Sequence, residues 1–149
     1  MGAVAAMPTS PVVLPEILTY SDQSVLLVHG VENGKEFWWP PGAYWLAQKA
    51  CHLAEEQPDD WVRRVLREQV RASLSRTRLR SVEFIDRSHP PVLVYEAQLS
   101  DRPLPSPDYN FDEARYFPLD ALPENLGRDA RHGQWLRSLL HRIQPTLAA

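Results

Sequence analysis

The stretch PDDWVRRVLREQVRAS, residues 58–73, decides the fold of this chain. Its mostly apolar stripe recurs at steps of three and four residues, which places it on one face of an α-helix. The members of the stripe are Trp61, Val62, Val65, Leu66, Gln69 and Val70. Pro58, Asp59 and Asp60 suit a first helical turn, because proline tolerates an early position and the acids oppose the positive end of the helix dipole. We therefore predict a helix from Pro58 to Ser73.

Runs of β-branched and aliphatic residues on both sides of this helix predict strands. Before it, the runs are Val12–Tyr20, Ser24–Val31 and Phe37–Trp39, separated by turn residues. After it, they are Leu79–Ile85, Pro91–Leu99 and Glu113–Pro118, and an amphipathic helix is expected at Gln134–Ile143. Strands, a helix, further strands and a terminal helix favour an α/β or α+β sandwich.

Length and composition describe one ordinary globular domain. The chain has 149 residues, 44% of them hydrophobic, so we expect a single domain over residues 11–149 behind a mobile N-terminus at residues 1–10. The net charge of −3 favours neither nucleic acid nor a membrane surface, and no apolar run is long enough to span a bilayer. Without a recognisable leader, a cytoplasmic location is expected. The single Cys51 excludes an internal disulfide and a cysteine-built zinc site.

Three stretches resemble the Nudix hydrolase family, together covering about Val12 to Leu140. Trp-Trp-Pro-Pro-Gly-Ala at residues 38–43 is similar to the family's tryptophan and Leu-Pro-Gly-Gly before its signature loop. The helix from Pro58 stands where the signature helix belongs, and Glu113–Leu126 looks like the family's late strand and proline-bounded turn. The resemblance implies a central mixed β-sheet between helices, with the 58–73 helix beside the site.

The family signature is Gly, five residues, Glu, seven residues, then Arg-Glu-U-x-Glu-Glu-x-Gly-U, where U is a bulky aliphatic residue. Our preferred alignment places Ala43 at the first glycine and Glu56 at the first glutamate, with extra residues within 44–55. The remaining signature positions then fall on Arg64, Val65, Leu66, Glu68, Gln69, Arg71 and Ala72. An alternative aligns Arg67-Glu68 with the family's Arg-Glu, but it puts polar Gln69 at an aliphatic position.

In the family these carboxylates hold metal ions that neutralise a pyrophosphate and activate water, because Mg²⁺ and Mn²⁺ prefer oxygen ligands. Here Glu56 and Glu68 remain as candidate catalytic and metal-binding residues, with Gln69 offering a neutral amide. Metal affinity should fall sharply. Arg64, Arg67 and Arg71 flank Glu68 at helical spacing, so Glu68 is open to a second interpretation as an exposed ion pair. Arg71 also replaces a glycine, whose backbone conformation would be costly for arginine.

Other candidate ligand-binding residues have equally ordinary structural interpretations. Arg63 to Arg80 holds seven arginines and one glutamate, which suits phosphate binding or a solvated helix face. Trp39, Tyr44 and Trp45 could stack on a base or pack in the core. Glu113, like Glu96, could supply a replacement acid from a strand. No aromatic residue interleaves with the arginines, so single-stranded nucleic acid is disfavoured.

Three functions follow as hypotheses. The first is a Nudix-fold protein with a degraded metal site that binds a nucleotide-like or phosphorylated ligand, its hydrolysis weak or lost. The second is an active Mg²⁺- or Mn²⁺-dependent hydrolase of nucleoside diphosphate derivatives, which would use Glu68 and Glu56. The third is a structural or regulatory module that forms a homodimer.

Overall fold

The computed structural model describes residues 12–32, 34–42, 51–52, 57–85, 87, 90–109, 111–127 and 129–147. The strands before the first helix are β1 (Val12–Ser21), β2 (Ser24–Glu32), β3 (Lys35–Trp39) and β4 (Cys51–His52). They are followed by α1 (Pro58–Val70), β5 (Leu74–Glu83), β6 (Val92–Leu99), the 3-10 turn η3 (Pro107–Tyr109), β7 (Phe111–Pro118) and α2 (Ala130–Arg142). The predicted order of strands and helices is therefore confirmed.

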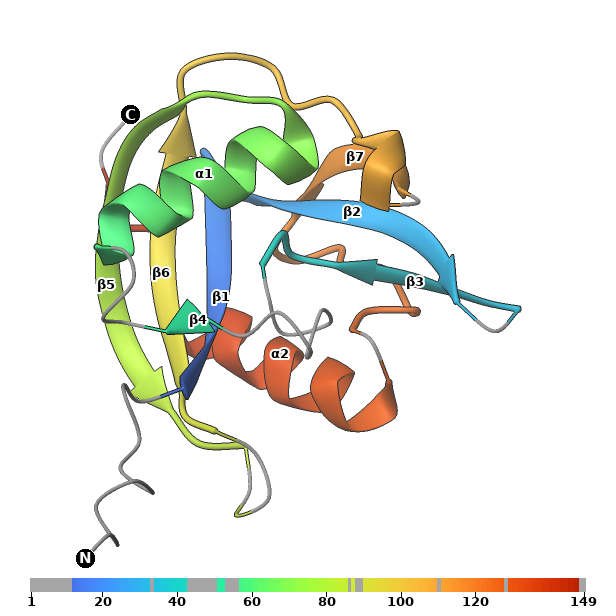
Figure 1. Cartoon of the computed structure of the whole chain (residues 1–149). Helices are drawn as coiled ribbons and strands as arrows, with labels where there is room; N and C mark the ends of the chain where they lie inside the picture. Colours follow the sequence, from blue (N-terminus) through green and yellow to red (C-terminus); the bar gives the residue numbers. More distant parts are fainter. Residues whose placement is uncertain are drawn as a thin grey trace, which may run out of the picture.

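The described strands form one mixed sheet in the order β3-β2-β1-β6-β5, with β4 paired to β1 and β7 paired to β2 (Figure 1). Strands β1 and β6 are parallel, in a register that runs from Leu14 opposite Val92 to Thr19 opposite Ala97. The other pairs are antiparallel. The central mixed sheet expected from the Nudix resemblance is present.

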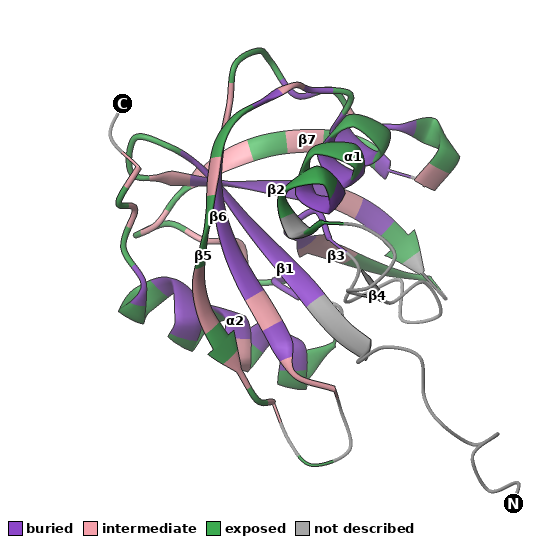
Figure 2. Cartoon of the chain, turned by 60° about the vertical axis from the view of Figure 1, so that its left-hand side comes forward, coloured by how far each residue is buried: buried purple, intermediate pink, exposed green. Residues whose placement is uncertain are grey.

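Each face of the sheet packs against one helix, because strand side chains alternate between the two faces. On β2, Leu26 and Val28 belong to the core under α1, whereas Val25 and Leu27 belong to the core under α2. The central strands are consequently buried on both sides, as Figure 2 shows for β1 and β6. This arrangement is the α+β sandwich predicted from the order of elements.

Helix α1 ends three residues earlier than predicted, and the chain caps it in a specific way. Arg71 adopts a left-handed conformation, with φ 52° and ψ 35°, and its N–H donates to the Arg67 carbonyl. The proline-rich segment after β6 then supplies donors to the last two carbonyls of the helix: Ser106 N–H to Gln69 O at 3.1 Å and Leu104 N–H to Val70 O at 2.8 Å. This segment therefore closes the end of α1, which would otherwise have unpaired carbonyl groups.

Two further boundaries differ from the sequence prediction for physical reasons. Strand β5 begins at Leu74 instead of Leu79, because its backbone ladder with β6 continues through an edge segment of polar side chains. Helix α2 begins at Ala130, where the Asp129 side chain accepts from the His132 N–H at 2.8 Å and caps the first turn. In the described part of the chain, no helix is long and apolar enough to cross a membrane.

Candidate functional site

The candidate site lies where β1 separates from β2. These two strands pair only near their connecting turn, at Tyr20 with Val25 and Ser21 with Ser24. Farther back along β1, Gly42 forms an antiparallel bridge with Glu16. The chain leaving β3 thus reaches β1 at Gly42, where this glycine also contacts the signature helix.

Gln69 is the α1 side chain that reaches this glycine. Its side-chain Oε1 accepts from the Gly42 N–H at 3.1 Å, and its Nε2 donates to the Gly42 carbonyl at 3.2 Å. Gln69 is 2% exposed, so both bonds are shielded from water. The orientation of the amide follows from this pairing, because a backbone N–H bonds only to an acceptor. One neutral side chain therefore satisfies both main-chain polar groups of Gly42.

The other two acidic positions of the signature helix do not face Gly42 as carboxylates. Val65 is buried in the core between α1 and the sheet. Glu68 lies on the outer side of α1, where its Oε1 accepts from Arg64 Nη1 at 3.1 Å and from the Tyr109 hydroxyl at 3.3 Å. Burial and the adjacent Glu68 charge raise the pKa of Tyr109. Glu68 is thus engaged as an ion pair and hydrogen-bond acceptor, as its second interpretation predicts.

The residues described here do not fit the divalent cation that the resemblance implies. Mg²⁺ takes oxygen ligands, usually one or two protein carboxylates together with waters and substrate phosphates. Within the described ranges, no group of three or more His, Cys, Asp or Glu side chains is placed to hold a metal ion. Gln69 turns an N–H donor, and no acceptor, toward the Gly42 carbonyl oxygen. Predicted residues Ala43, Tyr44, Trp45 and Glu56 lie outside the described part of the chain.

The arginine-rich run divides between two elements. On α1, Arg64 pairs with Glu68, while Arg67 and Arg71 are exposed. On β5, Arg76 and Arg80 make contacts with acceptors on β6. The run is therefore divided between a helix and a strand, and its β5 members Arg76 and Arg80 are engaged with β6.

Trp39 and Glu113 have roles away from the candidate site. Trp39 is 2% exposed and packs against Phe37 and Phe111, with ring centroids 5.7 Å and 6.1 Å apart, so it is a core residue and does not stack on a ligand. Glu113 lies on β7 and pairs with Arg115 at 3.2 Å. No hydrogen bond or ion pair joins Glu113 to α1 within the described residues.

A buried acid–imidazole pair lies on the other side of Gly42, and the sequence analysis missed it. His132 Nε2 and Glu16 Oε2 form a hydrogen bond of 2.7 Å, and both side chains are 1% exposed. A Cβ added at Gly42 would lie 3.6 Å from Glu16 Oε1 and 3.0 Å from the Pro15 carbonyl oxygen. Gly42 is thus enclosed between Gln69 and Glu16. The available sequence signal was a glutamate inside the otherwise apolar run of β1.

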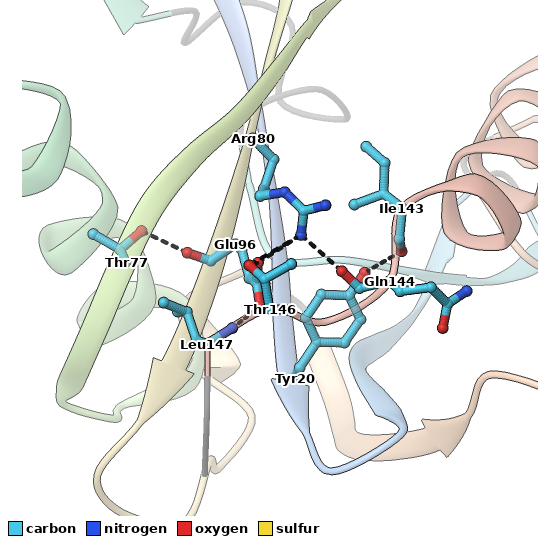
Figure 3. A network of polar contacts seen from close by, with 8 residues as sticks. All are labelled: Tyr20, Thr77, Arg80, Glu96, Ile143, Gln144, Thr146 and Leu147. Atoms are coloured by element: carbon cyan, nitrogen blue, oxygen red, sulfur yellow. Dashed lines mark hydrogen bonds and ion pairs between the residues drawn. The ribbon is translucent and has the colours of Figure 1, made fainter.

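Glu96, the other strand acid considered as a replacement ligand, instead holds the C-terminal segment (Figure 3). It is fully buried and accepts from Arg80 Nη1 at 2.7 Å, from the Thr146 N–H at 2.6 Å and from the Leu147 N–H at 2.8 Å. Burial alone would raise the pKa of Glu96, but these hydrogen bonds outweigh it and lower the pKa. These contacts join β6 to β5 and to the C-terminal segment, so the Glu96 carboxylate stabilises the fold.

Comparison with solved structures places this arrangement in a known fold. A MutT Nudix hydrolase from Burkholderia pseudomallei is similar with a TM-score of 0.67 and 20% identity, over 91% of this chain and 100% of that chain. A Nudix hydrolase from Nitrosomonas europaea gives a TM-score of 0.68 and 17% identity, over 95% and 78%. An ADP-ribose pyrophosphatase from Streptococcus suis gives 0.57 and 17%, over 91% and 96%.

No protein-family model matches the chain, and no curated protein matches it in sequence. The likeness is therefore one of architecture. The chain has the Nudix hydrolase fold.

Proposed function

We propose that this chain is a Nudix-fold binding protein for a nucleotide-like or otherwise phosphorylated small molecule, with metal-dependent hydrolysis weak or lost. The pairing of the Gln69 amide with Gly42 carries this proposal. Where α1 meets the loop leaving β3, the helix presents a neutral amide whose donor and acceptor are already used. The described part of α1 therefore directs no carboxylate toward this loop.

Two exposed arginines support a phosphorylated ligand. Arg67 and Arg71 lie at the end of α1, and both are exposed. A guanidinium group binds phosphate oxygens with two parallel hydrogen bonds, which suits a pyrophosphate or a terminal phosphate. One protein of similar fold is named as an ADP-ribose pyrophosphatase, which makes nucleoside diphosphate derivatives the first ligands to test.

The test combines turnover with metal-free binding. Release of phosphate or nucleoside monophosphate is measured from ADP-ribose, UDP-glucose, diadenosine tetraphosphate and ATP, each with Mg²⁺ and with Mn²⁺. We expect no turnover, and a rise in Tm with one of these compounds in EDTA. Arg67→Gln should reduce that rise in Tm, whereas the control Arg87→Gln should not. Arg87 is an exposed residue in the connection between β5 and β6, and the whole length of β5 separates it from the last turn of α1.

The exposed Glu68 carboxylate favours a second candidate function, Mg²⁺- or Mn²⁺-dependent hydrolysis of nucleoside diphosphate derivatives. Its side chain is 44% exposed, so exchanging the Arg64 contact for a cation would need no opening of the core. Turnover that disappears in Glu68→Gln would establish this function and overturn the binding proposal.

The dimerising module remains a hypothesis, for which sedimentation equilibrium is the measurement.

A further inference from the structure

Gly42 is held from two directions by groups of different charge. On the α1 side, Gln69 closes two hydrogen bonds with its main chain. On the α2 side, the Glu16 carboxylate lies against its Cα, and His132 binds the far oxygen of that carboxylate. Because Gln69, Glu16 and His132 are all at least 98% buried, these contacts act in a low-dielectric environment.

A neutral amide suits this position better than a carboxylate does. An amide supplies one acceptor to the Gly42 N–H and one donor to the Gly42 carbonyl, so both main-chain polar groups of Gly42 are paired. A carboxylate would still accept from the N–H, but its second oxygen would face the carbonyl oxygen with no hydrogen between them. It would also bury a second negative charge near Glu16. Such an arrangement is stable only if a cation lies between the oxygens or the carboxyl group keeps its proton.

We propose that Gln69 is a positioning residue whose two neutral hydrogen bonds replace a cation as the link between α1 and the loop that leaves β3. The loop is therefore fixed at Gly42 in a metal-free protein, independent of cation supply. One consequence rests on the proposed function: the binding site would be organised before any ligand or metal arrives. The link itself is a property of the folded chain, and it is measured without ligand.

The first experiment uses the wild-type chain and native-state hydrogen exchange. The Gly42 N–H should be protected at least about 100-fold in EDTA, because it is buried and bonded to a side chain anchored in α1. Addition of Mg²⁺ or Mn²⁺ should leave both this protection and the Tm unchanged. Rapid exchange of Gly42 in EDTA, or a rise in either quantity with the cation, would overturn the proposal.

The second experiment compares Gln69→Glu with Gln69→Met, which has similar length and no hydrogen-bonding amide. Both should lower the Tm in EDTA, by about 4–10 °C for the methionine variant, from two lost neutral hydrogen bonds in a domain of this size. Mg²⁺ or Mn²⁺ should restore the Tm of Gln69→Glu and leave that of Gln69→Met low. A glutamate variant that ignores cations, or that is as stable as wild type in EDTA, would contradict the proposal.

The two proposals fail in different ways. Turnover of a nucleoside diphosphate derivative by the wild-type chain would overturn the proposed function while leaving the Gly42 exchange result intact. Loss of Gly42 protection in EDTA would overturn the positioning role of Gln69 whatever the chain binds. If Gln69→Glu does not fold in EDTA, the wild-type exchange measurement still decides.

Discussion

The buried pair between Glu16 and His132 makes a quantitative prediction about stability. The two residues are 116 positions apart in sequence and join the central strand β1 to α2 through a 2.7 Å contact with 1% exposure on each side. In His132→Leu, the Glu16 carboxylate loses its partner inside the core. Removing one partner of a buried pair of this kind costs about 3–5 kcal/mol.

This loss is a large part of the free energy of unfolding, which is about 5–15 kcal/mol for a domain. At about 2–4 °C per kcal/mol for a chain of this size, the Tm should fall by about 6–20 °C. Glu16→Leu removes the same contact without leaving a carboxylate in the core and should cost less, about 1–3 kcal/mol. The double variant removes both polar groups and fills their space with apolar atoms, so it should return to within about 1 kcal/mol of wild type.

Urea denaturation of the four proteins at one pH, fitted to a two-state transition with a shared slope, gives the coupling energy. We expect the double variant to be more stable than His132→Leu. Additive losses in the double variant would refute the reasoning, because they would show that each side chain stabilises the fold through other contacts. A change in slope would show that the native state had rearranged, and the coupling energy would then need a second pair of substitutions such as Glu16→Gln and His132→Gln.

Four further predictions follow from single positions. Gly133→Ala should destabilise α2 although alanine is the better helix former, because its Cβ would meet the Leu126 carbonyl oxygen at 2.2 Å; urea denaturation measures the loss. Arg71→Gly should raise stability in the same assay by about 1 kcal/mol, since glycine takes the left-handed cap without strain. Glu96→Gln should lower the free energy of unfolding at neutral pH by about 2–3 kcal/mol. The lowered pKa of Glu96 gives stability that is present above the unfolded-state pKa and lost as the pH falls through the folded-state pKa. The variant should therefore show a flatter decline of Tm at acid pH, the acid limb, in a plot of Tm against pH. Burial lowers the pKa of His29, but its two carboxylate neighbours outweigh that effect and raise the pKa. The stability that His29 contributes is therefore full below the unfolded-state pKa and is lost as the pH rises through the folded-state pKa. His29→Gln should remove this loss of stability on the alkaline side of the same plot of Tm against pH.

Each of these has a clear contrary result. A Gly133→Ala variant as stable as wild type would mean that the Leu126 backbone moves freely, and a destabilised Arg71→Gly would mean that the arginine side chain contributes more than its backbone strain. Acid limbs of equal steepness in wild type and Glu96→Gln, or an unchanged alkaline limb in His29→Gln, would contradict the assigned pKa directions.

The sequence by itself determined the local elements, because they depend on neighbouring residues. The period of the apolar residues from Trp61 to Val70 defines α1 and its buried face, and the apolar run from Val25 to Val28 defines a strand buried on both sides. Turn residues separate these elements. The Nudix resemblance, drawn from residues 38–43, the helix from Pro58 and Glu113–Leu126, then predicted the central mixed sheet between helices, and the order of elements agrees with it.

Only the tertiary structure decided what the site residues do, because their partners are distant in sequence. Gln69 lies on the apolar face of α1, and nothing local shows that its amide closes on Gly42, 27 residues earlier. Glu68 looks like a metal ligand or an ion pair until the fold brings Tyr109 to it from 41 residues away. Glu16 on β1 pairs with His132 on α2, 116 residues later. Periodicity selects which face of an element is buried, whereas the contact made on that face depends on how the whole chain folds.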